Sequence, residues 1–457
     1  MREDTICALA TAAVESGIGI IRVSGPEAVP IVSTLVRSKS GHAVDISETH
    51  RIKYGFIYDG KEPLDEVLIL TMLAPRSYTG EDTVEIDCHG GVLMMRKILD
   101  AVVRAGARLA EPGEFTKRAF LNGRIDLSEA EAVGDIITSE NENALKASVR
   151  QLRGSVSREI KGYRAQILED DAFIEAGLDD PEHISLDGFT DQLKTHVEMI
   201  LSGIRQLIAS ADDGRRLREG IRTVILGKPN AGKSSLLNAL VGADRAIVTD
   251  IAGTTRDTLE EHINLKGVSL TIVDTAGIRA TEDTVEKIGV ERALKAASDA
   301  DLLIYVVDAS VPLDASDEQI IGELGDRKCI VLMNKSDLQA VISEEELEKK
   351  TGRPVLSISA KQETGMDLLE EKIRAMFFHE ELRFNDQVII TNERHKYCLG
   401  EAAKALEEVL RSITMDMPED FYTIDLMRAY EELGYILGEQ VSEDLVNEIF
   451  SKFCMGK

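Results

Sequence analysis

The sequence has few cysteines and no long apolar run. Its five cysteines are widely spaced, odd in number and form no CxxC pair: Cys7, Cys88, Cys329, Cys398 and Cys454. This spacing is typical of a reducing cytosol. No run approaches the about 20 apolar residues of a membrane span, and the acids at the N-terminus do not resemble a signal peptide. We therefore expect a cytoplasmic protein that has no membrane segment.

Basic residues are also scarce relative to acidic ones. Lys and Arg total 53 against 81 Asp and Glu, which gives a formal net charge of -28. The negative electrostatic field of such a chain opposes binding to nucleic acid, because phosphates are also negatively charged. Any contact with RNA is therefore expected to be local or shared with a partner.

The chain is too long for one hydrophobic core. Its 457 residues correspond to about three domains. The first part predicts an α+β domain, with short β-like runs at 19–23, 67–73 and 83–87 and a helix at 93–105. No proline separates Pro112 from Pro181, and Ser128 opens a capping-box pattern that predicts the start of a long helix.

Strand and helix patterns alternate between two helical regions. Residues 190–217 and 385–453 have helical periodicity, whereas the part between them reads as α/β. Helices on both sides of an inserted domain most simply form one bundle. We therefore expect a multidomain protein with an α+β domain at 1–120, a discontinuous helical domain at 121–218 and 378–457, and an inserted α/β Ras-like domain at 219–377.

A phosphate loop opens the inserted domain. Residues 227–234 read GKPNAGKS, which matches GxxxxGKS/T between a strand-like and a helix-like run. Backbone N–H groups of such a loop bind phosphate oxygens, Lys233 reaches the β and γ phosphates, and the Ser234 hydroxyl is a Mg2+ ligand. The loop alone does not separate ATP from GTP.

Later motifs favour GTP. Asn334-Lys335-Ser336-Asp337 follows an apolar strand, and the Asp337 carboxylate can accept from two N–H donors of guanine that adenine does not offer. Ser359-Ala360-Lys361 would bring a backbone N–H to the guanine carbonyl. Asp274-Thr275-Ala276-Gly277 ends another strand, where Asp274 suits the Mg2+ shell and Gly277 the γ phosphate.

The next residue predicts an unusual hydrolysis mechanism. Ile278 stands where many small GTPases have a water-orienting glutamine, and it cannot form a hydrogen bond. Candidates for that role are Glu282, Asp283, Glu286 and Glu291. A switch loop at 249–257 offers Thr255 to Mg2+ but no evident arginine finger beyond Arg256, so a bound monovalent cation could supply the missing charge.

The chain contains the motifs GKPNAGKSS, DIAGTTRD, DTAGIR with VEKIGVERA, NKSD and the terminal FCMGK. Together these motifs resemble the bacterial tRNA modification GTPases of the MnmE (TrmE) family over essentially the whole chain. The resemblance implies a G domain activated by K+-dependent dimerisation. It implies K+ ligands at Asn230, Thr249, Ile251 and Thr254, Mg2+ at Ser234 and Thr255, and catalytic roles for Glu286 and Lys233. The GTP-binding residues it implies are Asn230, Ala231, Gly232, Lys233, Ser234, Ser235, Thr249, Asp250, Ile251, Ala252, Gly253, Thr254, Thr255, Asp274, Thr275, Ala276, Gly277, Asn334, Lys335, Asp337, Ser359, Ala360 and Lys361.

The resemblance also implies a tetrahydrofolate one-carbon derivative in the N-terminal domain. The folate residues would be Arg22, Glu85, Arg124 and the terminal Lys457. Cations suit folate carboxylates, and a carboxylate suits the pterin N–H donors. Lysine also occurs in the family where this chain has Arg124. Cys454 is read either as a buried cysteine at a helix end or as a reactive residue beside folate.

The implied function is modification of tRNA at carbon 5 of the wobble uridine. The family acts as a homodimer with an FAD-dependent partner, glucose-inhibited division protein A, in a heterotetramer or larger assembly. The product would carry an aminomethyl or carboxymethylaminomethyl group. A GTP-driven assembly switch, which binds ribosomal RNA or protein partners without chemistry, is the alternative from another class.

A helical stripe is the candidate for RNA contact. Five cations recur at helical spacing beside the apolar Val149, Val156 and Ile160: Lys146, Arg150, Arg153, Lys161 and Arg164. The stripe is either a solvated face or a ridge that binds tRNA phosphates or an acidic partner. Gly154 in its middle weakens the prediction of one helix.

Overall fold

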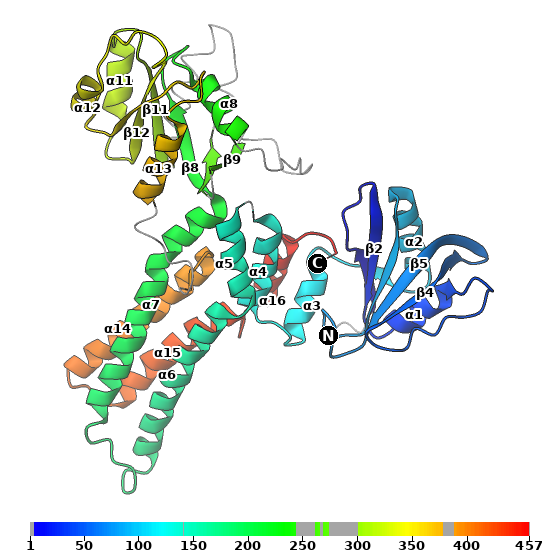
Figure 1. Cartoon of the computed structure of the whole chain (residues 1–457). Coiled ribbons are helices and arrows are strands. Elements are labelled where there is room, and N and C mark those ends of the chain that lie inside the picture. The colour runs from blue at the N-terminus through cyan, green and yellow to red at the C-terminus, as the bar shows by residue number, and fades with distance from the viewer. Residues whose placement is uncertain are drawn as a thin grey trace. The chain divides into compact units, whose positions relative to one another are not determined.

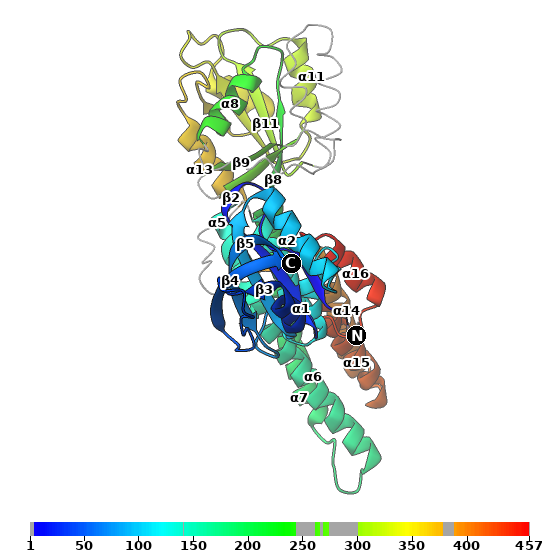
Figure 2. The ribbon, with the colours of Figure 1, turned by 90° about the vertical axis from the view of Figure 1, so that its right-hand side faces the viewer.

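The computed structural model describes residues 4–139, 141–243, 261–265, 268–273, 300–377 and 388–456. Contacts divide the chain into two compact units. The first comprises Met1–Ile137, Ser148–Ile200 and Glu401–Lys457, and the second comprises Thr138–Ala147 and Leu201–Gly400. Each unit has its own sheet (Figures 1 and 2). No helix among the described residues combines the length and the apolarity that a membrane span requires.

The sheet of the first unit is almost entirely antiparallel. Seven strands of the described chain form it: β1 (Ile6–Leu9), β2 (Ser16–Ser24), β3 (Val36–Arg37), β4 (Arg51–Asp59), β5 (Glu62–Met72), β6 (Thr83–Gly90) and β7 (Arg108–Leu109). Their order is β3-β4-β5-β6-β2-β1-β7, and only β1 and β7 are parallel. The predicted runs at 19–23, 67–73 and 83–87 correspond to β2, β5 and β6.

Alternation along the strands gives this sheet two different faces. In β5, Val67 and Ile69 are buried, whereas Leu68 between them is 43% exposed. Helices α1 (Ala28–Leu35) and α2 (Val92–Arg104) pack on the buried face and close an apolar core. The opposite face carries Arg22 of β2 directly across from Glu85 of β6.

Helices from both ends of the chain contribute to the first unit. Those before the second sheet are α3 (Glu114–Leu121), α4 (Leu127–Thr138), α5 (Glu142–Leu152), α6 (Ser155–Asp179) and α7 (Phe189–Glu219). Those after it are α14 (Glu393–Thr414), α15 (Asp420–Leu437) and α16 (Glu443–Ser451). Leu127 and Ala130 of α4 share a core with Val446 and Phe450 of α16. The predicted packing of the two helical regions is therefore confirmed for this pair.

A buried arginine joins α6 to the end of α15. The guanidinium of Arg164 donates to both carboxylate oxygens of Glu439 at 2.6 Å and lies 4.0 Å from the ring centroid of Tyr430. The bond to Arg164 is the main cause that lowers the pKa of Glu439. Arg164 was predicted on an exposed cationic stripe, which is wrong, because only 7% of it is exposed.

The stripe fails for a second reason. Gly154 adopts a φ of 77° between α5 and α6, so the chain turns there and does not continue as one helix. Glycine accepts this left-handed conformation without the Cβ penalty of other residues. Lys146 pairs with Glu142 on its own helix at 3.3 Å, and Val149, expected on an apolar face, is 39% exposed.

The capping box predicted at Ser128 is also wrong. Ser128 lies inside α4 and is fully buried. The box begins two residues earlier: Asp126 Oδ1 accepts from the Glu129 backbone N–H at 3.0 Å, and Glu129 Oε2 accepts from the Asp126 N–H at 3.0 Å. Asp126 has the same capping chemistry as serine, so the sequence pattern did not separate them.

The second unit has a parallel sheet with one antiparallel edge. Six strands of the described residues form it: β8 (Ile221–Leu226), β9 (Glu261–Leu265), β10 (Val268–Ile272), β11 (Leu302–Asp308), β12 (Cys329–Asn334) and β13 (Val355–Ser357). The order is β13-β12-β11-β8-β10-β9, and β9 pairs antiparallel with β10. Separate cores on the two faces involve α8 (Lys233–Ala243) with α13 (Met366–Phe377), and α11 (Ala315–Glu323) with α12 (Glu344–Thr351).

This arrangement confirms the predicted α/β fold of the inserted part. Strands β8, β10, β11, β12 and β13 run parallel in the order that creates a crevice beyond their carboxyl ends. Ligands bind at such edges in open α/β sheets. The phosphate loop and the guanine motif both follow strands of this sheet.

Candidate nucleotide and folate sites

The phosphate loop links β8 to α8 as its sequence predicts. Lys233 is the first residue of α8, and its Nζ donates to the carbonyl oxygens of Gly227 at 2.7 Å and Lys228 at 2.8 Å. The lysine thus lies across its own loop. Phosphate oxygens are the stronger acceptors, so a bound nucleotide would compete for this ammonium group.

Asn334 contacts the phosphate loop at Ala231. Its Nδ2 donates to the Ala231 carbonyl at 2.8 Å, and its Oδ1 accepts from the Ala360 N–H at 3.0 Å. Only 3% of Asn334 is exposed. A Cβ on Gly232 would lie 2.0 Å from Nδ2, and the φ of 102° at Gly232 also favours glycine. One side chain therefore fixes both the phosphate loop and the segment at Ser359-Ala360-Lys361.

The residue predicted to read guanine, Asp337, is oriented by a serine. Ser359 Oγ donates to Asp337 Oδ1 at 2.6 Å, and this bond is the main cause that lowers the pKa of Asp337. Asp337 is thereby kept as an acceptor of N–H donors. Lys335, at a φ of 64°, places its Nζ 2.5 Å from Asp308 Oδ2. The structure therefore brings together Asn334, Asp337 and Ser359 as predicted.

A partly buried network at Lys228 was not predicted. Lys228 Nζ lies 2.6 Å from Asp317 Oδ2 and 2.9 Å from Asp314 Oδ2. Asp314 is the N-cap of α11 in a capping box with Asp317. Asp317 is 1% exposed and also accepts from the hydroxyl of the fully buried Tyr305 at 2.8 Å. The loop is thus fixed to α11 through residues more than 80 positions apart.

Several predicted nucleotide residues lie outside the described residues. These are Thr249, Asp250, Ile251, Ala252, Gly253, Thr254, Thr255, Asp274, Thr275, Ala276, Gly277, Ile278, Glu282, Asp283, Glu286 and Glu291. Of the ion ligands, Asn230 and Ser234 are described. Asn230 has a φ of 59°, a conformation that asparagine tolerates better than most residues.

The first unit brings together the predicted folate residues that are described. Arg22 Nε donates to Glu85 Oε1 at 2.8 Å, and Arg22 Nη1 donates to the Gly456 carbonyl at 3.3 Å. The guanidinium groups of Arg22 and Arg124 lie 5.2 Å and 5.1 Å from the ring centroid of Tyr78. Lys457 follows Gly456 and lies outside the described residues. Tyr78, which connects the two arginines, was not predicted.

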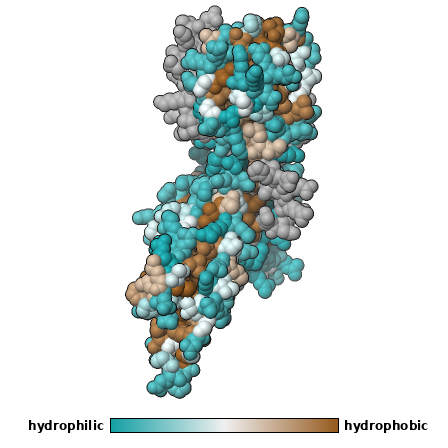
Figure 3. Space-filling model, turned by 90° about the vertical axis from the view of Figure 1, so that its left-hand side faces the viewer, coloured by the Kyte–Doolittle hydropathy of each residue, from teal (hydrophilic) through white to brown (hydrophobic). Residues whose placement is uncertain are grey.

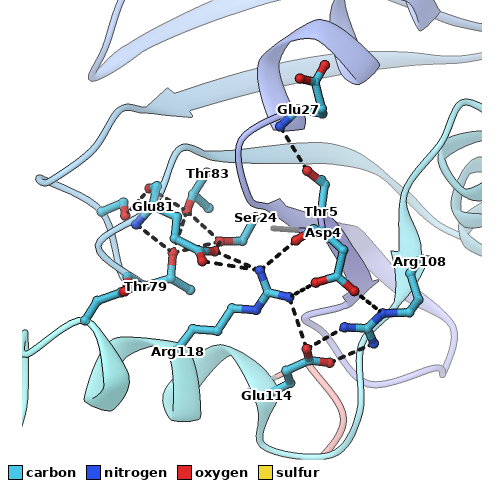
Figure 4. A network of polar contacts seen from close by, with 12 residues as sticks. Asp4, Thr5, Ser24, Glu27, Thr79, Glu81, Thr83, Arg108, Glu114 and Arg118 are labelled. Carbon is cyan, nitrogen blue, oxygen red and sulfur yellow. Dashed lines mark hydrogen bonds and ion pairs between the residues drawn. The ribbon is translucent and has the colours of Figure 1, made fainter. Parts of the chain in front are cut away.

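A charged network next to this site was also not predicted (Figure 4). Arg118, 8% exposed, is paired with Asp4, Glu81 and Glu114 at distances of 2.8 to 3.1 Å. Arg108 binds the other side of Asp4 and Glu114. The carboxylates in turn organise neighbouring hydroxyl groups, because Ser24 donates to Glu81 at 2.9 Å and contacts Thr79 at 2.7 Å. The network fixes α3 to the strands that bear Arg22 and Glu85.

Cys454 is exposed and lies three residues after the end of α16. The interpretation of this residue as a buried cysteine is therefore wrong. Its carbonyl accepts from the Gly113 N–H at 3.4 Å, which holds the terminal segment near the start of α3. The other four cysteines are buried.

Comparison with known proteins gives a consistent family. The profile described as the MnmE helical domain matches residues 127–454, and the profile described as the GTP-binding protein TrmE N-terminus matches residues 5–124. The tRNA modification GTPase MnmE of Lachnoclostridium phytofermentans is 56% identical over 100% of both chains. That of Clostridioides difficile is 46% identical over 100% of this chain and 99% of the relative.

Two solved structures match part of this chain. A crystal structure of Era from Aquifex aeolicus bound to GDP.AlF4- is 28% identical, covers 40% of this chain and 66% of that chain, and has a TM-score of 0.28. The G domain of the FeoB iron transporter from T. maritima is 32% identical, covers 34% of this chain and 98% of that chain, and has a TM-score of 0.26.

Proposed function

The chain belongs to the MnmE family of tRNA modification GTPases, and we propose that it adds an aminomethyl or carboxymethylaminomethyl group to carbon 5 of the wobble uridine of certain tRNAs. It is a GTP hydrolase that takes part in tRNA modification. One observation supports the proposed chemistry: Ser359 orients Asp337 in one unit, and Arg22 pairs with Glu85 in the other.

The nucleotide site would hydrolyse GTP with Mg2+ and K+. Ser234 and Thr255 would hold Mg2+, and Asn230, Thr249, Ile251 and Thr254 would hold K+ through oxygen atoms. The described donors fit, because a hydroxyl and an amide are the hard oxygen ligands that such ions prefer. Lys233 would bind the β and γ phosphates, and Glu286 would orient the attacking water. Asn334 and Asp337 would fix the base.

The Arg22 site would hold a tetrahydrofolate one-carbon derivative, which supplies the carbon when bound. The donor set fits this ligand: Glu85 suits the pterin N–H donors, and Arg124 and Lys457 suit carboxylates. Tyr78 offers an aromatic face between the two arginines. Arg22 neutralises Glu85 in the structure, so the pterin would share this carboxylate with the arginine. Cys454 lies close in sequence to Gly456 and would be a further candidate for the chemistry.

Exposed apolar surfaces support the proposed partners. On the open face of the N-terminal sheet, Ile18, Ile52 and Tyr54 are 60%, 65% and 51% exposed, which would suit a second copy of the chain. Figure 3 shows hydrophobic residues gathered along the helical region, where Met199 and Ile424 are 61% and 66% exposed. Such patches mark protein contacts, and we propose that the FAD-dependent partner, glucose-inhibited division protein A, joins the homodimer in the cytoplasm.

Reconstitution tests this function. The chain, its FAD-dependent partner, GTP, Mg2+, K+ and a 13C-labelled reduced folate would be incubated with ammonium or glycine as the amine donor and with an unmodified tRNA transcript that has a wobble uridine. We expect the label in the methylene carbon attached to carbon 5 of that uridine, measured by mass spectrometry of nucleosides. GTP hydrolysis without bound folate and without labelled tRNA would instead support the alternative, a GTP-driven assembly switch on ribosomal RNA or protein.

A further inference from the structure

Exposed cations gather where the chain turns from α5 to α6. Arg153 lies just before the turn at Gly154, and Arg158 and Lys161 lie in the first two turns of α6. All three are exposed, as is Arg124, which precedes α4. We call these four residues, Arg124, Arg153, Arg158 and Lys161, the cationic corner.

Short contacts show that the members of the corner are near one another. Arg158 Nη1 donates to the Arg153 carbonyl at 2.7 Å. A Cβ on Gly154 would lie 3.0 Å from Glu129 Oε1 and 3.5 Å from Arg158 Nη1. Lys161 Nζ lies 3.6 Å from Asp126 Oδ2, and Asp126 follows Arg124 by two positions. The turn at Gly154 therefore brings Arg153, which follows α5, and the cations of α6 close to the start of α4.

The two nearby carboxylates are used by the fold. Asp126 Oδ1 accepts from the Ser128 hydroxyl at 2.7 Å, and Asp126 Oδ2 accepts from Ser157. Asp126 and Glu129 also form the capping box of α4. In the part of the chain that the structure describes, Arg124, Arg153 and Arg158 have no carboxylate within ion-pair distance.

Among the described residues, these three arginines form no ion pair although the chain has a formal net charge of -28. Solubility alone does not account for unpaired cations in so acidic a chain. Acidic residues outnumber basic ones in this protein, so exposed arginines would ordinarily find partners. Arginine presents a planar fork of donors that matches phosphate oxygens, often in pairs. The cationic corner therefore has the chemistry of a phosphate-binding surface.

We propose that the cationic corner binds backbone phosphates of tRNA beside the proposed folate site. The proposal rests on the proposed function for the identity of the RNA. Arg124 belongs to both regions, because its guanidinium lies over Tyr78, whose ring also faces Arg22. RNA held by Arg153, Arg158 and Lys161 would thus lie near the one-carbon donor. This surface replaces the straight stripe expected from the sequence, from which Lys146 and Arg164 are removed by their own ion pairs.

The test is tRNA affinity as a function of salt. The double variant Arg153→Glu with Arg158→Glu and the neutral variant Arg153→Gln with Arg158→Gln would be titrated with a fluorescent tRNA transcript between 50 and 200 mM KCl. The slope of log affinity against log salt becomes shallower by about 0.9 for each phosphate that no longer meets a cation. We expect the slope to become shallower by about two in both variants, and the Glu variant to bind at least about 10-fold more weakly at 100 mM KCl. A transcript without a wobble uridine should show the same reduction, because phosphate binding does not read sequence.

A matched control has the same charge change on the other face of the N-terminal sheet. Arg96 and Lys97 are both exposed on α2, and Arg96→Glu with Lys97→Glu should leave the slope unchanged. Unchanged tRNA affinity in both corner variants would overturn the proposal, as would an equal reduction in the control. Weakened binding to the FAD-dependent partner with tRNA binding intact would also overturn it and would assign the corner to an acidic protein surface.

Two further readouts separate this proposal from the proposed function. GTP turnover and folate binding should stay within about twofold of wild type in the Gln variant, which also verifies that the protein folds. If wild type binds no folate but the corner variants bind tRNA more weakly, the corner stands and the folate chemistry fails. If wild type binds folate and the corner variants bind tRNA as tightly as wild type, the folate site stands and the proposal for the cationic corner fails.

Discussion

Asn334 donates its side-chain amide to the Ala231 carbonyl at 2.8 Å, so the first residue of the guanine motif braces the phosphate loop. The two motifs are 103 residues apart in sequence and yet share one side chain. The segments predicted to bind the base and the phosphates are therefore connected through one side chain.

Asn334→Ala should weaken GTP binding about 10- to 100-fold. Both the Ala231 carbonyl and the Ala360 N–H would lose their partner, at about 1–3 kcal/mol for each buried group. The measurement is GTP affinity with a fluorescent analogue. Gln319→Ala removes an exposed amide on α11 and should bind GTP like wild type. Equal affinities of the Asn334 variant and this control would show that the brace is dispensable.

Lys228→Met should raise the KM for GTP more than it lowers kcat. The substitution keeps the aliphatic stem but leaves the buried Asp317 without its cation, so the loop loses its anchor to α11. We expect a rise in KM of about 10-fold, because an uncompensated buried charge is costly. Adding Asp317→Asn should restore part of the affinity in steady-state assays. Lack of any rescue would point to a direct role of Lys228 on the nucleotide.

Hydrolysis should require K+ and Glu286. Ile278 cannot orient water, and the sequence offers no evident arginine finger, so charge and water must be supplied otherwise. GTP turnover in KCl should exceed that in NaCl at equal ionic strength, and Asn230→Ala should abolish the difference. Glu286→Ala should reduce turnover on the order of 100-fold. Equal rates in the two salts would refute the K+ requirement.

Removal of the last four residues, 454–457, should weaken folate binding and leave GTP binding intact. The deletion removes Lys457 and the Gly456 carbonyl that accepts from Arg22, whereas the nucleotide residues lie in the other unit. Calorimetry with a stable reduced folate and with GTP measures both affinities. Lys452→Ala, at an exposed lysine on the same segment, is the control. Unaltered folate affinity after truncation would exclude Lys457 from the site.

The pair of Arg164 and Glu439 should make the first unit sensitive to acid. The bond to Arg164 lowers the folded-state pKa of Glu439 below its ordinary value of 4.5. The pair therefore contributes stability above about pH 4.5, and this contribution disappears as the pH falls through the folded-state pKa. Arg164→Met should lower the free energy of unfolding by about 2 kcal/mol at pH 7, measured by urea unfolding.

The difference between Arg164→Met and wild type should shrink as the pH falls below 4.5 and through the lowered pKa of Glu439. Arg411→Met is the control, because Arg411 is 61% exposed and pairs with Glu408 on the same helix. It should change stability by no more than about 0.5 kcal/mol. A constant difference between pH 7 and pH 3 would contradict the assigned role of the ion pair.

Local patterns predicted much of this fold, and long-range contacts account for what they missed. The β8 to α8 transition, β12 and α7 follow from apolar periodicity and motif context, which depend on neighbouring residues. Lys228 and Tyr78 were missed because their partners are distant in sequence and no local signal reports the pairing. Arg118 has one local partner, Glu114, but its pairing with Asp4 and Glu81 is likewise long-range. Gly154 weakened the prediction of one helix but did not predict the turn, since a glycine in a helical pattern does not reveal its φ.

The bond from Arg22 to Gly456 spans 434 residues, and this separation has a consequence for synthesis. Strands β1 to β7 can pair as soon as the first part of the chain leaves the ribosome, because all their partner strands lie within residues 6–109. Residues 201–400, most of the second unit, are then made before α15 and α16 exist. The G domain can therefore fold while the first unit still lacks its C-terminal helices. It would be able to bind GTP before the proposed folate site could form.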